Sequence, residues 1–390
     1  MPIFLFGIDT GDIGIGDRLN WVWHSDAYQN AIIFACGVVV WWLLRYASQL
    51  EHWRNAARQI RKNRIAIVCF FILLGYLLIG VLDSISWRDP LFNQEGVLTR
   101  NEDGRVVYKP RSLSLLDRLC TPLRERTEKT YSAPLATHLY AKSTVQTPDG
   151  RTTREYPPLE YPRTHLLGTD KVGSDVFYRA LKGIRTGLII GGFTTLIAVP
   201  FAIFFGVVAG YFGGWIDDII QYIYATLDSI PAILLIIAFM LLFGQGLFNL
   251  CLIMGISSWV GLCRILRGET LRLRELEYVQ AAEAFGVRRG FIILKHLVPN
   301  LLHIVLITSI LGFSNFVLAE AVLSYLQIGV EPTMGSWGNM INTARLELAR
   351  DPIVWWNLSA AFAFMFGLVL PANLFGDAVR DALDPRLRTG

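Results

Sequence analysis

The feature that most constrains this chain is a run of 18 residues without a charge, IAIVCFFILLGYLLIGVL at 65–82. One charged side chain at the centre of an inserted helix costs about 2.5–3.5 kcal/mol, and crossing the hydrocarbon of a bilayer takes roughly 20 apolar residues. The run therefore predicts a membrane-spanning helix. The composition agrees, because 17% of the residues are charged, whereas soluble domains carry about 25% charged residues.

Six further apolar runs are candidate spans. Since backbone amides in lipid must bond within their own segment, helices are the expected structure. The predicted fold class is an all-α integral membrane protein, a polytopic helical bundle with an external insert after its second span. The further runs lie at 29–44, 187–209, 219–243, 247–263, 303–326 and 353–376.

The charges of the loops predict the orientation of the bundle. Residues 45–64 carry six Lys and Arg against one Glu, and residues 264–296 carry seven against four Glu. Both loops are expected in the cytoplasm, because cytoplasmic loops carry an excess of Lys and Arg. The N-terminus is then outside and the C-terminus inside. The acidic loop at 213–218 fits this orientation poorly.

The chain divides into four parts under this prediction. Residues 1–64 hold the first span and a basic cytoplasmic linker, and 65–82 hold the second span. Residues 83–186 form an external insert that ends in an amphipathic segment, and 187–390 form the helical core with a cytoplasmic loop at 264–302. A small folded insert is favoured over a disordered one. Its core could be built by Leu113, Leu115, Leu116, Leu119, Tyr131 and Leu135.

Two stretches beside the spans are amphipathic. At 45–64, and again at 174–185, apolar residues recur at spacings of three and four. Each stretch would turn an apolar stripe to lipid or neighbouring helices and its Arg side chains outward. For the first stretch, a helix that simply extends out of the membrane is an equal alternative.

The predicted cytoplasmic loop at 264–302 has the sequence pattern of two helices separated by a glycine. Strong helix formers run over 275–285, and Gly286 can take the left-handed conformation that ends a helix. The next segment runs to Pro299, which cannot continue a helix interior without cost. Small alanine side chains on the first helix suit docking into a groove of a partner. Composition alone leaves an interfacial helix that anchors the loop as an alternative.

A few polar residues lie inside the predicted spans. Ionisable side chains at membrane depth usually face the bundle or a water-filled path. The candidates for lining a translocation path are therefore Asp228, Asn315 and Glu320. The alternative is that they satisfy backbone groups at kinks or pair between helices, and for Asp228 the nearby Pro231 favours it. Closely spaced glycines expected at tight helix contacts are Gly191, Gly192, Gly206 and Gly210.

Several catalytic and metal-binding motifs are absent from the sequence. No Gly-Lys dipeptide occurs, so the chain has no phosphate-binding loop of the G-x-x-x-x-G-K-[ST] type. It also has no HExxH, no GxSxG and no CxxC pair. We therefore expect a chain that is not an enzyme, that binds no cofactor or metal, and that takes no nucleic acid as a partner.

The segment QAAEAFGVRRGFIILKHLVP (280–299) resembles the EAA loop of permease subunits of ABC importers. The family pattern is Glu-Ala-Ala, three residues, Gly, nine residues, Ile, any residue, Leu-Pro. The matching residues are Ala281, Ala282, Gly286 and Pro299, and the departures are Gln280 for Glu, His296 for Ile and Val298 for Leu. The first departure removes a carboxylate that could pair with a basic residue.

Four other stretches narrow the resemblance to the second, C-type permease of the dipeptide/oligopeptide class. They are HLLGTDKVGSDVFYRALKGIRTGL (165–188), AGYFGGWIDDIIQYIYATLDSIPAILL (209–235), AEAVLSYLQIGVEP with SWGNMI (319–341) and GDAVRDALDPRLR (376–388). The resemblance covers about 60–390 and implies six core spans, so the run at 29–44 would be an additional one.

The resemblance implies partners and a location in the bilayer of the bacterial inner membrane. A second permease subunit would complete the pore, two ATPase subunits would use ATP, and an external solute-binding protein would deliver a substrate. The substrate could be a dipeptide, a longer peptide, a peptide antibiotic or a nickel complex. The residues expected to couple to the ATPase are Glu277, Gln280, Ala281, Ala282, Glu283, Gly286 and Pro299.

Two other classes of protein compete with this hypothesis. A stand-alone secondary carrier or channel would need intramembrane charges as its coupling site, and such charges are scarce here. A membrane enzyme is disfavoured, because no catalytic constellation converges on one side of the predicted bundle.

Overall fold

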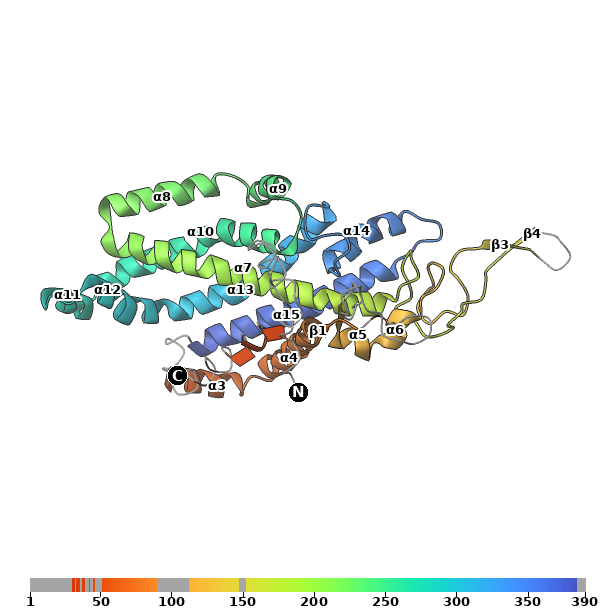
Figure 1. Cartoon of the computed structure of the whole chain (residues 1–390). Helices are drawn as coiled ribbons and strands as arrows, with labels where there is room; N and C mark the ends of the chain where they lie inside the picture. Colours follow the sequence, from red (N-terminus) through yellow and green to blue (C-terminus); the bar gives the residue numbers. More distant parts are fainter. Residues whose placement is uncertain are drawn as a thin grey trace, which may run out of the picture. The chain divides into compact units, whose positions relative to one another are not determined.

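The computed structural model of the chain describes residues 51–89, 91, 112–146 and 152–383, with scattered positions between 30 and 45 (Figure 1). It divides into two compact units. The smaller unit comprises Met1–Leu50 and Val81–Thr121, and the larger unit comprises Glu51–Gly80 and Pro122–Gly390. The first predicted span, at 29–44, falls largely outside the described residues, so it stays a prediction.

The larger unit is mainly helical, apart from the stretch at 126–175. Its helices are α3 (Glu51–Ile60), most of α4 (Arg64–Ser84), α7 (Val176–Phe212), α8 (Gly214–Asp228), α9 (Ala232–Phe243), α10 (Leu247–Arg274), α11 (Glu277–Ala284), α12 (Arg289–Ile292), the π-helical turn η1 (Ile293–Leu297), α13 (Val298–Tyr325), α14 (Trp337–Leu348) and α15 (Trp356–Leu383). It also contains the antiparallel hairpin of β3 (Ser143–Gln146) and β4 (Thr152–Glu155).

The smaller unit holds the short elements that follow α4. The antiparallel pair β1 (Ser86–Trp87) and β2 (Leu113–Ser114) leads into α5 (Leu115–Leu119). Helix α6 (Thr121–Glu125) follows, and all of it except Thr121 belongs to the larger unit. Ser114 caps α5, because its hydroxyl accepts from the Asp117 N–H while the Asp117 carboxylate accepts from the Ser114 N–H.

Within the described residues, five helices are long and apolar enough to cross a membrane: Arg64–Ser84, Val176–Phe212, Leu247–Arg274, Arg289–Tyr325 and Trp356–Ala382. Each coincides with a predicted apolar run, and the all-α membrane fold is thereby confirmed. The run at 219–243 is not one straight helix, because α8 and α9 meet at a bend of 83°. Pro231 is the N-cap of α9 and has no N–H to donate, so the helix breaks there.

Helix α7 is longer than its predicted span. Its 37 residues extend about 55 Å at 1.5 Å per residue, well beyond roughly 30 Å of hydrocarbon. The amphipathic segment expected at 174–185 therefore forms the first turns of this helix and is no separate surface helix. Pro200 lies inside α7, yet the helix continues through it.

Glycines let α7 pack closely against two neighbours, and α7, α10, α13 and α15 lie side by side (Figure 1). A Cβ on Gly206 would lie 2.8 Å from the Cys263 carbonyl oxygen, and one on Gly210 would lie 2.7 Å from that of Arg267. A Cβ on Gly191 would overlap the Phe313 ring of α13, whereas one on Gly192 would meet nothing within 4 Å. Three of the four glycines expected at helix contacts are thus confirmed there.

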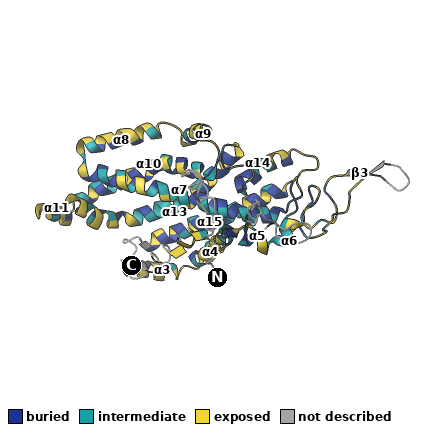
Figure 2. Ribbon diagram, in the orientation of Figure 1, coloured by how far each residue is buried: buried dark blue, intermediate teal, exposed yellow. Residues whose placement is uncertain are grey.

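Buried residues follow the seams between the helices, while the outer faces are exposed (Figure 2). Many of the exposed side chains are large and hydrophobic. In α9, for example, Leu241 is 73% exposed and Met240 is 1% exposed. The predicted core of the insert is only partly present. Leu116 and Tyr131 are buried in different units, and Leu119 and Leu135 are exposed.

Candidate functional site

The segment between α10 and α13 has the predicted order of helix, glycine and helix. Helix α11 ends in a Schellman motif, because the Gly286 N–H bonds the Glu283 carbonyl and the Val287 N–H bonds the Ala282 carbonyl at 3.1 Å. This motif needs a left-handed residue, and Gly286 has φ +73°. The glycine therefore fixes where α11 stops and where the chain turns back.

One side of α11 faces the protein and the other is open. Val279 is fully buried in a cluster with Leu273 and Ile292, and Ala282 packs against that cluster. Phe285, which caps the C-terminus of the helix, is 87% exposed. The remaining residues expected to couple to the ATPase are also exposed: Glu277, Gln280, Ala281, Glu283, Gly286 and Pro299.

The sequence had suggested that a helix ends at Pro299, but the structure shows that it does not. It lies in the first turn of α13, where its missing N–H is tolerated. The preceding turn, Ile293–Leu297, is π-helical, and Arg289–Tyr325 together form one candidate span. The wider turn relieves the clash that a proline makes with the preceding backbone, so the chain continues into the span.

Two hydrogen bonds tie α11 to other helices. The Tyr211 hydroxyl, at the end of α7, donates to Glu283 Oε1 at 2.6 Å. The Asn300 amide of α13 donates to the Tyr278 hydroxyl at 3.2 Å, at an exposed position. Local sequence patterns gave no signal for Tyr211, because 72 residues separate it from Glu283.

Two of the three acidic residues of α8 pair with arginines of α10. Asp217 accepts two bonds from Arg267, at 2.5 and 2.7 Å. Asp228 pairs with Arg264 at 2.5 Å, with both side chains about half exposed. The acidic loop at 213–218, which fitted the charge rule poorly, thus carries a carboxylate that is neutralised within the chain.

Glu320 and Asn315 lie in different surroundings on α13. Glu320 is 2% exposed and accepts from the Ser324 hydroxyl at 2.7 Å. Gly338 of α14 lies close against it, because a Cβ there would be 3.1 Å from Glu320 Oε1. Asn315 is exposed, on one face with Leu318 and Val322. Of the residues expected along a translocation path, Glu320 is therefore sealed between two helices, and the path itself stays a prediction.

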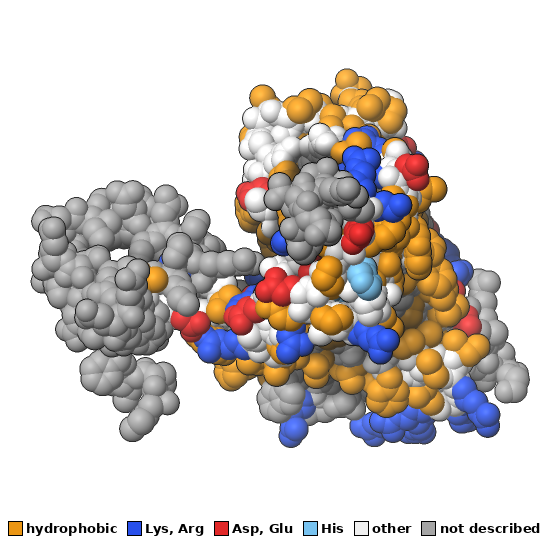
Figure 3. All heavy atoms as spheres, turned by 90° about the vertical axis from the view of Figure 1, so that its right-hand side faces the viewer, with side chains coloured by type: hydrophobic (Ala, Val, Ile, Leu, Met, Phe, Trp, Pro, Cys, Tyr) orange, Lys and Arg blue, Asp and Glu red, His pale blue; other side chains and the backbone are white. Residues whose placement is uncertain are grey.

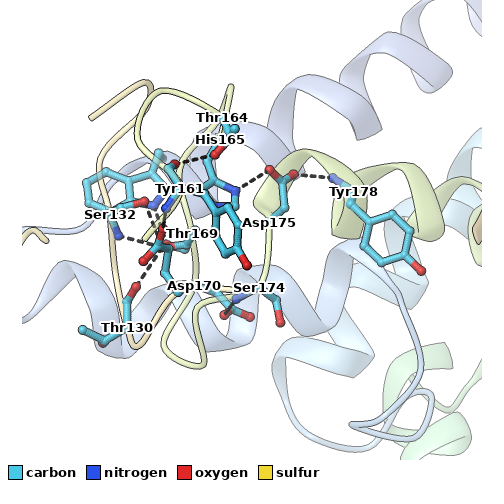
Figure 4. A network of polar contacts seen from close by, with 12 residues as sticks. Thr130, Ser132, Tyr161, Thr164, His165, Thr169, Asp170, Ser174, Asp175 and Tyr178 are labelled. Atoms are coloured by element: carbon cyan, nitrogen blue, oxygen red, sulfur yellow. Dashed lines mark hydrogen bonds and ion pairs between the residues drawn. The ribbon is translucent and has the colours of Figure 1, made fainter. Parts of the chain in front are cut away.

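A second polar cluster surrounds the start of α7 (Figure 4). Asp175 caps the helix by accepting from the Tyr178 N–H at 2.9 Å, and its other oxygen lies 2.9 Å from His165 Nδ1. Asp170 accepts from the Val172 and Ser174 N–H groups, both at 2.9 Å. This cluster includes the Leu-Gly-Thr-Asp sequence at 167–170, which supported the resemblance.

The same cluster joins three parts of the larger unit. Thr169 accepts from the Ser132 N–H at 2.7 Å and donates to the Thr130 carbonyl at 2.9 Å. The Trp356 indole N–H, at the start of α15, donates to the Thr169 carbonyl at 2.9 Å. The motif therefore connects the chain before α7 to the start of α15 and to the segment 130–132.

Charged side chains are interspersed over the end of the molecule that Figure 3 shows, and hydrophobic side chains line its right-hand flank. Beneath such surface charges, Glu347 of α14 is buried, with 1% of its surface exposed, and it accepts from the Tyr131 hydroxyl and the Asn357 amide. Burial raises the pKa of Glu347, although those two bonds oppose the rise. Burial also raises the pKa of Tyr131, and the neighbouring Glu347 adds to that rise.

No metal site is evident in the described part of the chain, where no three His, Cys, Asp or Glu residues form a group that could hold an ion. The segment from α11 to η1 is an exposed surface held on a buried apolar base, and it connects directly to two candidate spans.

Comparisons with known proteins identify the family. The family described as "Binding-protein-dependent transport system inner membrane component" matches residues 202–389. The chain is 37% identical over 225 residues to the dipeptide transport system permease protein DppC of Bacillus subtilis, covering 57% of this chain and 69% of the relative. It is 36% identical over 225 residues to the glutathione transport system permease protein GsiD of Pectobacterium atrosepticum, covering 58% and 74%.

One relative matches over a longer stretch. The dipeptide transport system permease protein DppC of Alkalihalophilus pseudofirmus is 29% identical over 337 residues, covering 86% of this chain and 91% of the relative. Among solved structures, an inward-facing MetNI methionine ABC transporter matches with 16% identity and a TM-score of 0.43, covering 53% of this chain and 97% of that one. On the sequence matches, the chain belongs to the family of binding-protein-dependent transport-system inner-membrane components, as a permease subunit of the dipeptide/oligopeptide class.

Proposed function

We propose that this chain forms half of the translocation pore of an ATP-driven peptide importer and docks an ATPase through α11 and Phe285. One observation carries the docking: a helix fixed on a buried base by Val279 presents its other side, with an 87% exposed Phe285, to the surroundings. A solvent-exposed aromatic beside small alanines suits insertion into a groove of a partner.

The partners follow from the family. The chain is a transport subunit, and separate ATPase subunits hydrolyse the ATP. A second permease completes the pore, and an extracytoplasmic solute-binding protein delivers the substrate. The relatives are named as permease proteins of dipeptide, oligopeptide and glutathione transport systems. These names favour a peptide as the substrate.

The orientation and the path belong to the same proposal. The docking segment is cytoplasmic, the C-terminus is cytoplasmic, the N-terminus is outside, and the insert within 83–186 is external. ATP-driven closure of the ATPase pair moves the docked helices, provided that α11 makes different contacts in each state. Asn315, on the exposed face of α13, is a better candidate for the path than the buried Glu320.

The docking is tested by placing a charge on the open side of α11. In Ala281→Asp the side chain is exposed, so the subunit should still insert and elute from size exclusion as the wild type does. Co-purification of the ATPase subunits and peptide uptake should both fall about tenfold, because a buried unpaired charge at an interface costs at least about 1.4 kcal/mol.

The matched control is Ala349→Asp, the same change at an exposed position after α14. It should leave both measurements at the wild-type level. Wild-type co-purification and uptake in Ala281→Asp would contradict the docking role. Uptake that persists without any ATPase subunit would favour a stand-alone carrier instead.

A further inference from the structure

We propose that the hydrogen bond from Tyr211 to Glu283 transmits movement of α11 to α7, so that Tyr211 and Glu283 are positioning residues for transport. This inference rests on the proposed docking of α11. The two residues join elements that are 72 positions apart in the chain, at a donor–acceptor distance of 2.6 Å. The acceptor is a carboxylate, and hydrogen bonds to an ionised group are stronger than neutral ones.

The two partners differ in burial. Tyr211 is 7% exposed and belongs to the apolar cluster that also holds Val279, the buried anchor of α11. Glu283 lies on the surface of α11, yet its Oε1 receives the Tyr211 hydroxyl. A hydrogen bond of this kind has a fixed direction, whereas the apolar contact of Val279 permits sliding. The bond therefore sets the position of α11 relative to the end of α7.

Helix α7 can carry such a movement along its length. It is continuous for 37 residues, and Tyr211 lies one residue before its last. Close contacts of Gly206 and Gly210 hold this end of α7 against α10, and Arg274 donates to the Gly210 carbonyl at 3.2 Å. A shift of α11 that pulls on Tyr211 thus acts on the end of one continuous helix that packs along α10 and α13.

The second tie of α11 offers an internal comparison. The Asn300–Tyr278 bond is longer, at 3.2 Å, is neutral, and lies at exposed positions where water competes for both groups. It connects α11 to α13, the helix that already continues from the same segment through α12 and η1. The chain itself links α11 to α13, so this hydrogen bond adds little, whereas the link to α7 depends on Tyr211.

The experiment uses the complete complex with its ATPases in lipid nanodiscs and needs no transported substrate. Nitroxide labels on cysteines at Leu196 of α7 and Phe366 of α15, both exposed, report the distance between these helices in a background without the native cysteines. Addition of ATP and vanadate should change that distance in the wild type. Tyr211→Phe and Glu283→Ala should each reduce the change at least twofold.

Conservative variants separate coupling from folding. Glu283→Gln keeps an acceptor for the Tyr211 hydroxyl and should retain most of the change. The double variant Tyr211→Phe/Glu283→Ala should be no worse than either single variant, since both remove one interaction. Tyr222→Phe is the control, because the Tyr222 side chain is 74% exposed and its hydroxyl makes no hydrogen bond within the described residues.

The same samples distinguish this inference from the docking proposal. ATPase subunits should co-purify with Tyr211→Phe at the wild-type level. If they are lost, the bond only supports the shape of α11, and the inference is wrong. It is also wrong if the wild-type distance does not respond to ATP and vanadate, or if Tyr211→Phe responds fully. Docking itself fails only if Ala281→Asp still binds ATPase.

Discussion

The two ends of α7 are held in place by different kinds of interaction. At its start, Asp175 caps the helix, and Asp170 and Thr169 accept or donate several bonds, all with side chains buried (Figure 4). At its end, one buried hydroxyl, that of Tyr211, reaches an exposed helix. The first end is fixed by buried polar bonds, whereas the second packs closely against α10 and, among the described residues, is tied to α11 by the single Tyr211 hydroxyl bond.

This difference has a physical meaning for a transport subunit. A single hydrogen bond to an exposed helix opens at a lower free-energy cost than a network of buried bonds, so the link between α7 and α11 can rearrange while the start of α7 stays fixed. A helix that is fixed at its start and bonded to a moving element at its end can tilt when that element moves. The predictions below test whether the two ends differ in this way.

The largest effect on stability is expected when alanine replaces one of two glycines that share a backbone conformation but differ in their surroundings. Gly173 has φ +75° and Gly286 has φ +73°. A Cβ on Gly173 would overlap the Glu128 carbonyl oxygen, whereas one on Gly286 would meet nothing within 4 Å. Gly173→Ala should lower the free energy of unfolding by about 3 kcal/mol or more, and Gly286→Ala by about 1 kcal/mol from backbone strain alone.

Thermal unfolding of the purified subunit in detergent measures this pair. Each variant serves as the control of the other, because the added methyl group and the strained φ are the same. Equal losses at both positions would show that the segment before α7, where Gly173 lies, is no more tightly built than the docking segment.

The next effect concerns Phe285, the most exposed aromatic of the docking segment. Phe285→Ala removes an 87% exposed ring that contacts little within the described chain, so subunit stability should change by less than about 0.5 kcal/mol. Affinity for the ATPase subunits should fall about tenfold, the loss typical of an aromatic anchor. Titration of labelled ATPase onto nanodisc-embedded permease gives that affinity. A matched exposed aromatic is Trp215 of α8, and Trp215→Ala should leave the affinity unchanged.

The smallest effect is a pH dependence of stability that arises from the buried Glu347. Because burial raises the pKa of Glu347 above its ordinary value of 4.5, the folded state resists ionisation of this carboxyl more than the unfolded state does. Stability should therefore decrease as the pH rises from about 4.5 through the raised pKa, by about 1.4 kcal/mol for every unit by which the two values differ.

Glu347→Gln tests that assignment. Gln has the shape of the protonated carboxyl, so its contribution should not change with pH. The difference in melting temperature between the wild type and this variant should grow from pH 4.5 toward neutral pH. Parallel curves for the two proteins would assign the dependence to other groups.

The sequence alone determined the features that depend on neighbouring residues. Apolar runs long enough to cross a bilayer predicted the five spans and the region of α8 and α9. The alanines and Gly286 predicted helix α11 and its stop. The helix stop expected at Pro299 was wrong, because a π-helical turn absorbs the proline. The composition of the insert also did not show that Leu116 and Tyr131 lie in different units.

Only the tertiary structure decided which polar side chains pair with one another at the candidate site. Asp217 meets Arg267 across 50 residues and Tyr211 meets Glu283 across 72, and neither spacing has a period that a sequence pattern could report. The same holds for Glu320, which reads as a path residue in the sequence and is sealed against α14 in the fold. Local propensity and hydrophobicity are properties of a segment, whereas the partner of a polar side chain is fixed only when distant segments pack together.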